Sequence, residues 1–318
     1  MTMKIERILA PTDFSAHSED ALRAALNLKK ELGAEVVDFV VLHVFDISEM
    51  LGLGWTVYGE GLEAEVVARM EEDSRKALFQ FIKKMGVEEG EVRTLVARGR
   101  PFVEIVRLAR SQEFDLVVMG THGRKGIEHL LLGSNAEKVV RKAPCSVLTV
   151  RHTEGRKDSP FPAKTILAPT DFSLTSERAM SMTIRLAQRY SSRIILLHVF
   201  GDLKIQEAIQ WTEYIPTGQT ELDLENGIMN RAKEELDSFV SKFPIGDIQV
   251  EKRVLSEVPH QGIIETATKE NVDLIVMGTH GRSGLNHLLM GSVAEKVVRA
   301  SPCPVLTVKP SEHGYEMT

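Results

Sequence analysis

The chain contains the same sequence twice, and this duplication limits its possible folds more than any other feature. Asp115–Val150 reads DLVVMGTHGRKGIEHLLLGSNAEKVVRKAPCSVLTV, and 27 of its 36 residues recur at Asp273–Val308. The same offset of 158 residues places ILAPTDFS at Ile8–Ser15 over an identical ILAPTDFS at Ile166–Ser173. Copies of about 150 residues are too long for solenoid units and have the usual size of a domain. The sequence therefore predicts two tandem domains.

Composition indicates where the two domains meet. Residues 151–162 read RHTEGRKDSPFP, a polar stretch broken by Gly and Pro that is typical of a linker. We therefore predict domain 1 at residues 1–150, the linker at 151–162, domain 2 at 163–310 and a tail at 311–318. Domains of this length can bury a core without disulfide or metal staples.

Each copy alternates apolar runs with amphipathic helical patterns. The strands expected in the first copy are Ile8–Ala10 (ended by Pro11), Val36–Phe45, Val92–Ala97, Leu116–Met119 and Ser146–Val150. The helices expected between them are Ser15–Leu32, Glu63–Met85, Pro101–Arg110 and Ser134–Lys142. Strands that are apolar on both faces and alternate with helices indicate a parallel sheet covered on both sides. The predicted fold class is α/β, with two tandem doubly wound five-stranded parallel-sheet domains of the Rossmann-like type.

Charge and hydropathy exclude several classes of protein. There are 39 Lys and Arg against 45 Asp and Glu, a net charge of −6, so the chain has no general attraction to nucleic acid or anionic lipid. No apolar run approaches the ~20 residues that span a bilayer, and the first residues lack a signal-peptide pattern. Cys145 and Cys303 occupy matching apolar segments and are expected to be buried, reduced thiols. These features favour a cytoplasmic protein.

The motif with the most chemical content is Gly-x2-Gly-x9-Gly-Ser, which starts at Gly120 and again at Gly278. Gly120 ends a buried strand, where the missing Cβ allows a ligand to approach the backbone, and Gly123 can turn its amide toward an anion. The helix that opens at Gly133 and Ser134 has N–H groups and a dipole that favour phosphate. A structural alternative stays open, because Ser134–Glu137 also fits a capping box.

Polar residues at other strand ends are further candidates. Asp13 and Asp171 follow the first strand of each copy, where a carboxylate could cap the next helix, accept ribose hydroxyls or hold a phosphate-bound Mg²⁺. His43 and His198 lie within strands, and we expect them to be hydrogen-bonded structural histidines at the rim or in the core.

The glycine loop also contains His122 and Arg124, matched by His280 and Arg282. A contact or structural role is favoured for the histidines, because no nucleophile or paired base lies nearby in the sequence. The arginines could pair with phosphate or stay solvated. The sequence has no P-loop, zinc-ligand spacing or hydrolase nucleophile motif. Any enzymatic turnover would therefore depend on these groups and a metal ion.

Taken together, these motifs resemble one known family. ILAPTDFS, VLHVF at Val41–Phe45 and MGTHGR-x-G-x6-GS-x-AEKVVR-x2-PC-x-VLTV are similar to the universal stress protein family in its tandem form. In that family the spaced glycine motif marks ATP-binding members. The resemblance implies a cytoplasmic stress-response protein with one adenine nucleotide (ATP, or AMP or ADP) per repeat, acting as a switch, and Mg²⁺ beside the phosphates. The alternatives are a slow Mg²⁺-dependent ATPase and an interaction protein that holds AMP.

The resemblance also assigns roles to individual positions. Adenine contacts fall on the backbone of Val44 and Val199, and ribose contacts on Asp13 and Asp171. The predicted nucleotide-binding residues are Pro11, Thr12, Asp13, Val44, Met119, Gly120, His122, Gly123, Arg124, Gly133, Ser134 and Asn135 in the first copy. In the second copy they are Pro169, Thr170, Asp171, Val199, Met277, Gly278, His280, Gly281, Arg282, Gly291, Ser292 and Val293.

Two further expectations concern partners and asymmetry. The resemblance implies that the domains pair within the chain through their last strands, Ser146–Val150 and Pro304–Val308, and leaves a homodimer open. Many family members have a Gly before the third helix, as at Gly99, but the second copy has Glu257 there. A charge added only at the rim of the second site predicts unequal nucleotide affinities.

Overall fold

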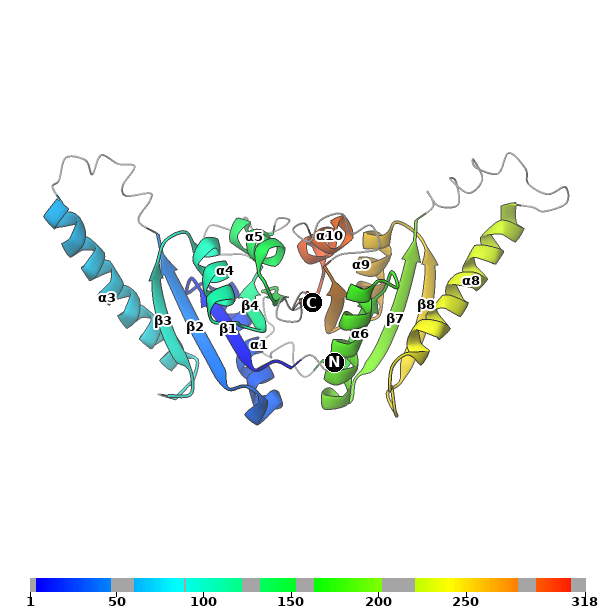
Figure 1. Cartoon of the computed structure of the whole chain (residues 1–318), viewed down its shortest axis with the longest axis horizontal. Helices are drawn as coiled ribbons and strands as arrows, with labels where there is room; N and C mark the ends of the chain where they lie inside the picture. The colour runs from blue at the N-terminus through cyan, green and yellow to red at the C-terminus, as the bar shows by residue number, and fades with distance from the viewer. Residues whose placement is uncertain are drawn as a thin grey trace, which may run out of the picture. The chain divides into compact units, whose positions relative to one another are not determined.

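The computed structural model divides into two compact units, Lys4–Phe161 and Pro162–Lys309, called here the first and second repeat. It describes residues 4–46, 60–88, 90–121, 132–152, 163–201, 221–279 and 290–309. Each repeat contains a five-stranded parallel sheet, with strand order β3-β2-β1-β4-β5 in the first and β8-β7-β6-β9-β10 in the second (Figure 1). The α/β fold class predicted from the sequence is confirmed.

The elements of each repeat follow the predicted alternation of strands and helices. The first repeat contains β1 (Arg7–Thr12), α1 (Ala16–Leu32), the 3-10 helix η1 (Gly33–Glu35), β2 (Asp38–Phe45), α3 (Glu60–Lys84), β3 (Arg93–Arg98), α4 (Pro101–Ser111), β4 (Leu116–Gly120), α5 (Ser134–Lys142) and β5 (Ser146–Val150). The second contains β6 (Thr165–Pro169), α6 (Leu174–Tyr190), β7 (Arg193–Phe200), α8 (Glu221–Ser241), β8 (Val250–Ser256), α9 (Pro259–Lys269), β9 (Leu274–Gly278), α10 (Ser292–Ala300) and β10 (Val305–Val308).

The prediction that Pro11 ends the first strand is wrong. β1 continues to Thr12, and Pro11 pairs in register with Leu42 of β2. On the other side of β1, the register with β4 includes only Ile8 and Leu9. Pro11 therefore lies where β1 has a single neighbour, and an edge-like position tolerates a residue without an N–H donor.

Helices cover both faces of each sheet. In the first repeat α1 and α3 share a face and are joined by the ion pair Lys84–Glu19, while α4 and α5 pack together on the other face (Figure 1). In the second repeat Lys242, the residue after α8, pairs with Glu177 of α6 at 2.6 Å in the same way. The chain builds β1, β2 and β3 in one direction and then returns to the other side of β1 to form β4. That reversal of strand order is where ligands bind in open α/β sheets.

The core of each repeat consists of its central strands and the inner faces of its helices. Leu9 of β1 and Val117 of β4 are both 0% exposed, and α1 adds the buried Leu22. Full burial of such aliphatic side chains contributes roughly 1.5–3 kcal/mol each. Cys145 and Cys303 are buried thiols, as predicted. No helix in the described part of the chain is both long enough and apolar enough to span a bilayer.

Candidate functional site

A polar turn connects the end of β1 to the start of α1. The carboxylate of Asp13 accepts hydrogen bonds at Oδ1 from the N–H (3.1 Å) and hydroxyl (2.6 Å) of Ser15. The Oγ of Ser15 accepts from the N–H of Ser18 at 3.3 Å and so caps α1. Asp171, Ser173 and Ser176 repeat this arrangement before α6. Ser15 and Ser173 are therefore the helix caps, and the aspartates hold these caps in position at the strand end.

Inside this turn an aromatic residue adopts a strained backbone conformation. Phe14 has a φ of 66°, in the left-handed region that costs a non-Gly residue about 1 kcal/mol. Its ring stacks on His43 at 4.3 Å between centroids, and His43 Nδ1 donates to the carbonyl of Thr12 at 2.9 Å. Phe172 (φ 64°), His198 and Thr170 form the same group in the second repeat.

This cluster confirms the structural role predicted for His43 and His198. Strain of this kind persists where the surroundings over-determine a conformation, and it gathers at functional sites. Phe14 and Phe172 were not among the predicted site residues. Their only sequence signal is their place inside the identical ILAPTDFS segments.

Gly120 ends β4 directly under the first turn of α1. A Cβ built on Gly120 would lie 2.8 Å from the carbonyl oxygen of His17, and one built on Gly278 would lie 3.0 Å from Cβ of Thr175. A Cβ at Gly120 would be closer to the backbone than real Cβ atoms come, and one at Gly278 would be tighter than most, so another residue at either position would force the helix to shift. These glycines therefore have a packing role, and contact of their backbone with a ligand stays a prediction.

Helix α5 begins beside the end of β4, and the described residues provide no side-chain cap for it. Gly133 is the N-cap residue, and its N–H donates to the carbonyl of Thr121 at 2.7 Å. Thr121 in turn donates its N–H to Val150 at the end of β5, at 3.0 Å. The hydrogen bond from Gly133 places the cap one residue before Ser134. The alternative that Ser134 is the N-cap of a capping box, which the sequence left open, is therefore wrong.

The second repeat has the same start of helix α10. Gly291 is the N-cap without a side-chain cap, and its N–H donates to Thr279 at 2.7 Å. Helix α5 begins with Ser134 and Asn135, and α10 begins with Ser292 and Val293. Of these residues, Ser134, Asn135 and Ser292 are exposed. N–H groups in a first turn have no acceptor within the helix, and the helix start carries partial positive charge. These two helix starts can therefore accept an anion.

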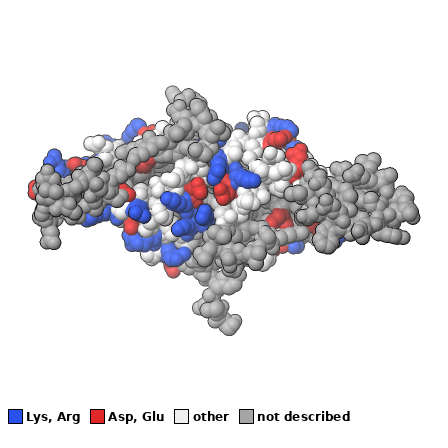
Figure 2. Space-filling model, turned by 90° about the horizontal axis from the view of Figure 1, so that it is seen from above, with Lys and Arg blue, Asp and Glu red and all other residues white. Residues whose placement is uncertain are grey.

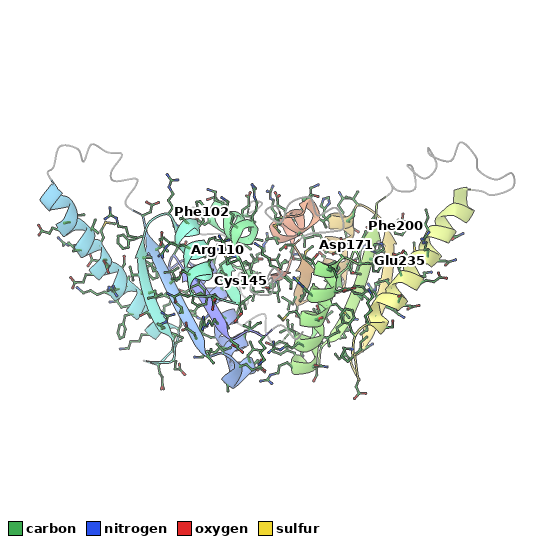
Figure 3. The ribbon with its side chains drawn as sticks, in the orientation of Figure 1. Phe102, Arg110, Cys145, Asp171, Phe200 and Glu235 are labelled. Carbon is green, nitrogen blue, oxygen red and sulfur yellow. The ribbon has the colours of Figure 1, made fainter. Side chains whose placement is uncertain are left out.

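The ends of β2 and β7 form another part of the same edge. Val44 is half-buried near the end of β2, and the carbonyl of Phe45 accepts from the N–H of Gly99 at 3.0 Å. In the second repeat Phe200, labelled with Asp171 in Figure 3, accepts from the N–H of Glu257 at 3.0 Å. The turns that follow β3 and β8 are thereby fastened to the ends of β2 and β7.

Both repeats have a carboxylate at the turn between the third strand and the next helix. In the first repeat Glu104 of α4 covers Gly99, and a Cβ built on Gly99 would lie 3.2 Å from Glu104 Oε1. In the second repeat Glu257 and Gly262 exchange these places, and a Cβ built on Gly262 would lie 3.3 Å from Glu257 Oε2. The sequence predicts a charge only at the second rim. That premise is wrong, because Glu104 provides one at the first.

The carboxyl ends of the parallel strands and the following helix starts bring most predicted residues to one edge of each repeat. These residues are Pro11, Thr12, Asp13, Val44, Met119, Gly120, Gly133, Ser134 and Asn135, and then Pro169, Thr170, Asp171, Val199, Met277, Gly278, Gly291, Ser292 and Val293. The side chains of Met119 and Met277 are buried, so only their backbone could reach a ligand. His122, Gly123, Arg124, His280, Gly281 and Arg282 lie outside the described residues.

Charged side chains of both signs are mixed on one face of the molecule. Lys and Arg side chains lie next to Asp and Glu on the face drawn in Figure 2, so charges of both signs alternate there. Among the described residues, no group of three or more His, Cys, Asp or Glu side chains is arranged to hold a metal ion.

Comparison with known sequences decides the family. The profile of the Universal stress protein family matches residues 4–151 and matches again at residues 162–309. The chain belongs to the universal stress protein family. The resemblance carried by the repeated motifs is thereby confirmed at the level of the family and of its duplication.

Individual universal stress proteins match either one repeat of this chain or nearly its whole length. A protein from Methanocaldococcus jannaschii is 39% identical over 147 residues, which cover 46% of this chain and 82% of that protein. A protein from Mycolicibacterium smegmatis is 28% identical over 309 residues, 95% of this chain and 97% of its own length. A crystal structure from Archaeoglobus fulgidus has the same fold, with a TM-score of 0.64, 22% identity, and coverage of 96% of this chain and 98% of that chain.

Proposed function

We propose that each repeat binds one adenine nucleotide, ATP first among them, and that its occupancy is a regulatory switch in a stress response. The observation that carries this proposal is the start of α5 and of α10. Each begins at a glycine without a side-chain cap, at the edge where strand order reverses. A helix start with exposed N–H groups at such an edge suits a phosphate group.

The carboxylate at the end of β1 suits the sugar. Ser15 holds Asp13 through two hydrogen bonds, so the carboxylate is in place before a ligand arrives. A carboxylate at this position of a doubly wound sheet can accept hydrogen bonds from ribose hydroxyls. Preorganisation of this kind lowers the entropy lost on binding. Asp171 would do the same in the second repeat, where Ser173 and Ser176 hold it.

The remaining parts of the proposal follow from the family resemblance. Mg²⁺ would accompany the phosphates and be held by phosphate oxygens and water, its usual mode in nucleotide sites. The last strands, Ser146–Val150 and Pro304–Val308, would pair the two repeats, and the protein would act in the cytoplasm. Nucleotide could switch the protein only if it binds one conformation more tightly than another.

The first experiment identifies the ligand and any chemistry. Purified protein is denatured, the released nucleotide is identified by chromatography, and phosphate release is then followed after addition of ATP and Mg²⁺. Retained ATP without turnover is the expected result. Steady phosphate release would instead support a slow ATPase, and AMP that added ATP does not displace would support an interaction protein.

The second experiment places a fixed negative charge in the first turn of α5 or of α10. In Ser134→Glu and Ser292→Glu, the new carboxylate lies in an exposed first turn, where it favours the helix but repels phosphate. We expect each variant to lose tight binding at one site, by a factor of at least about 10. Lys138→Gln and Lys296→Gln, one turn further along, change the charge by the same amount and should leave affinity unchanged. Normal affinity in the serine variants would contradict the proposal.

A further inference from the structure

Helices α4 and α5 of the first repeat pack together and carry an exposed surface of basic side chains. The exposed charged residues of these helices and of the N-cap position of α4, called here the basic face, are Arg100, Arg107, Arg110, Lys138, Arg141 and Lys142. The acidic residues of the two helices, Glu104 and Glu137, are half-buried, and Glu104 pairs with Arg107 at 2.7 Å. The basic face therefore holds a local excess of positive charge on a chain whose net charge is −6.

The second repeat has few of these charges on the same fold. At the offset of 158 residues that relates the repeats, the six positions correspond to Val258, Glu265, Thr268, Lys296, Arg299 and Ala300. Six positive charges thus become two positive and one negative. His260 takes the place of Phe102, and burial, followed by the charge of Lys296, lowers the pKa of His260 from its ordinary value of 6.5. This ring is therefore neutral at pH 7 and does not restore the lost charge, so the fold alone does not require a basic face.

Two lysines of the basic face converge on one aromatic ring. Phe102 of α4, labelled with Arg110 in Figure 3, has Lys138 Nζ at 4.8 Å and Lys142 Nζ at 5.7 Å from its ring centroid. Cation–π attraction of this kind offsets the repulsion between two ammonium groups. Both ammonium groups are thereby held near one point of the surface, where an anion is attracted by each of them.

Helix electrostatics explain only part of the basic face. A basic residue in the last turn of a helix interacts favourably with the helix dipole, as Arg110 does in α4. In the second repeat one basic residue per helix has this role, Lys269 in α9 and Arg299 in α10. Arg100 lies at the opposite end of α4, where the dipole disfavours a positive charge. The dipole therefore does not account for Arg100, and an external anion does.

We propose that the basic face is a docking surface for a short acidic segment of a partner protein. Val103 is 41% exposed and lies next to the half-buried Phe102 among the basic residues. Carboxylates separated by apolar side chains match this mixture of groups better than the phosphates of a nucleic acid do. The proposal goes beyond nucleotide binding and does not depend on it.

The length of the basic face and the charge of the whole chain favour a short partner segment. Arg100 and Arg110 lie about 15 Å apart along α4, because a helix rises about 1.5 Å per residue. A nucleic acid or a membrane extends well beyond the Debye length of about 8 Å, and so would also meet the repulsion of the net charge of −6. A short acidic segment interacts with the basic face alone.

The test measures binding of a fluorescein-labelled peptide of about 12 residues, with Leu at helical i, i+3, i+4 and i+7 spacing and Glu elsewhere. Fluorescence anisotropy on the full chain in low salt should show one peptide bound per chain. Arg100→Val/Arg110→Thr/Lys142→Ala should weaken binding about tenfold, because three attractive charges are removed. Each substitution introduces the residue that the second repeat has at the same position, so the fold should be retained.

A matched control separates the basic face from overall charge. Lys269→Gln/Lys296→Gln/Arg299→Gln also removes three charges, from the exposed surface of α9 and α10, and should leave peptide binding unchanged. Lys142→Ala alone removes one of the two ammonium groups over Phe102 and should weaken binding about threefold. Thermal unfolding of each variant shows whether its fold is intact, and the single variant tests the proposal if the triple variant does not fold.

Other occupants of the basic face are distinguished in the same buffer. A DNA duplex of about 20 base pairs and vesicles that contain phosphatidylserine should both bind more weakly than the peptide. Tighter binding of either, or a dimer of the wild type that Lys142→Ala dissociates, would assign the face to that occupant and overturn the proposal. Absence of peptide binding by the wild type, or equal losses in the two triple variants, would overturn it as well.

Discussion

The two repeats have the same backbone at the strand ends but different side-chain networks around it. Helix starts, strained Phe residues and close-packed glycines recur one for one. Some charged groups do not recur: Glu104 and Gly99 become Gly262 and Glu257, and Gln112 of the first repeat becomes Glu270 of the second. Duplication has therefore kept the backbone conformation at the strand ends and helix starts, while side chains at the rim and on the surface have changed. The following predictions test how far this equivalence extends.

The largest expected effect concerns the glycines under the first helix. Gly120→Ala should destabilise the first repeat by about 2 kcal/mol, because the new Cβ meets backbone atoms of His17. Gly278→Ala should cost somewhat less, because its nearest contact is the side chain of Thr175. Denaturant unfolding measures both. Gly227→Ala in α8 is the control, since nothing lies within 4 Å of its Cβ position. A wild-type midpoint for Gly120→Ala would show that α1 can shift away.

A smaller difference is expected between the two aspartates. Asp171 Oδ1 accepts from the Ser173 N–H (3.2 Å), the Ser173 hydroxyl (2.6 Å) and the Ser176 hydroxyl (2.5 Å). Asp13 Oδ1 accepts from the N–H and hydroxyl of Ser15, but the hydroxyl of Ser18, which matches Ser176, donates to the carbonyl of Ser15 at 2.9 Å. Both alanine variants should lose stability by about 1 kcal/mol, and Asp171→Ala more than Asp13→Ala.

Thermal unfolding of these variants is compared with that of Asp247→Ala, an exposed aspartate. Equal losses for Asp13→Ala and Asp171→Ala would mean that the third hydrogen bond contributes nothing. A loss as small as that of the control would mean that neither carboxylate holds its turn.

The smallest expected effect is on acid stability. Hydrogen bonds from Arg253 and then Arg193 lower the pKa of Glu270 from its ordinary value of 4.5. A lowered pKa in the folded state means that this stabilisation is complete above about pH 4.5 and is lost as pH falls through the folded pKa. Gln112 at the matching position cannot titrate, so the second repeat should be the more acid-sensitive. Hydrogen exchange of each repeat between pH 6 and 3 tests this, and Glu270→Gln should remove the difference.

Much of the fold could be predicted because it depends on local patterns. The alternation of buried runs such as Leu116–Gly120 with amphipathic helices such as Ser134–Lys142 is visible in the sequence. Proline at position 11 was misleading, because whether a strand tolerates it depends on which neighbour is still paired there. The pairing at Pro11 depends on the register of β1 with β4, which the local sequence does not reveal.

The site was less predictable, since it depends on contacts between distant segments. Ser134 has the local pattern of a cap, but the hydrogen bond of Gly133 to Thr121 decides where α5 begins. From the sequence, we explained Gly120 by the close approach of a ligand to its backbone. Packing against the first turn of α1 already favours a glycine at this position. The carboxylate of Glu104 was missed because the comparison of Gly99 with Glu257 was made one position at a time. Alignment of both positions in the two repeats would have revealed the exchange.

The central claim is that each repeat contains one working nucleotide site built on an uncapped helix start. Native mass spectrometry of the full chain with ATP and Mg²⁺ counts the bound molecules directly. The account predicts two per chain, one in Ser134→Glu and none in Ser134→Glu/Ser292→Glu. A folded wild-type chain that carries no nucleotide, or a double variant that still carries two, would contradict it.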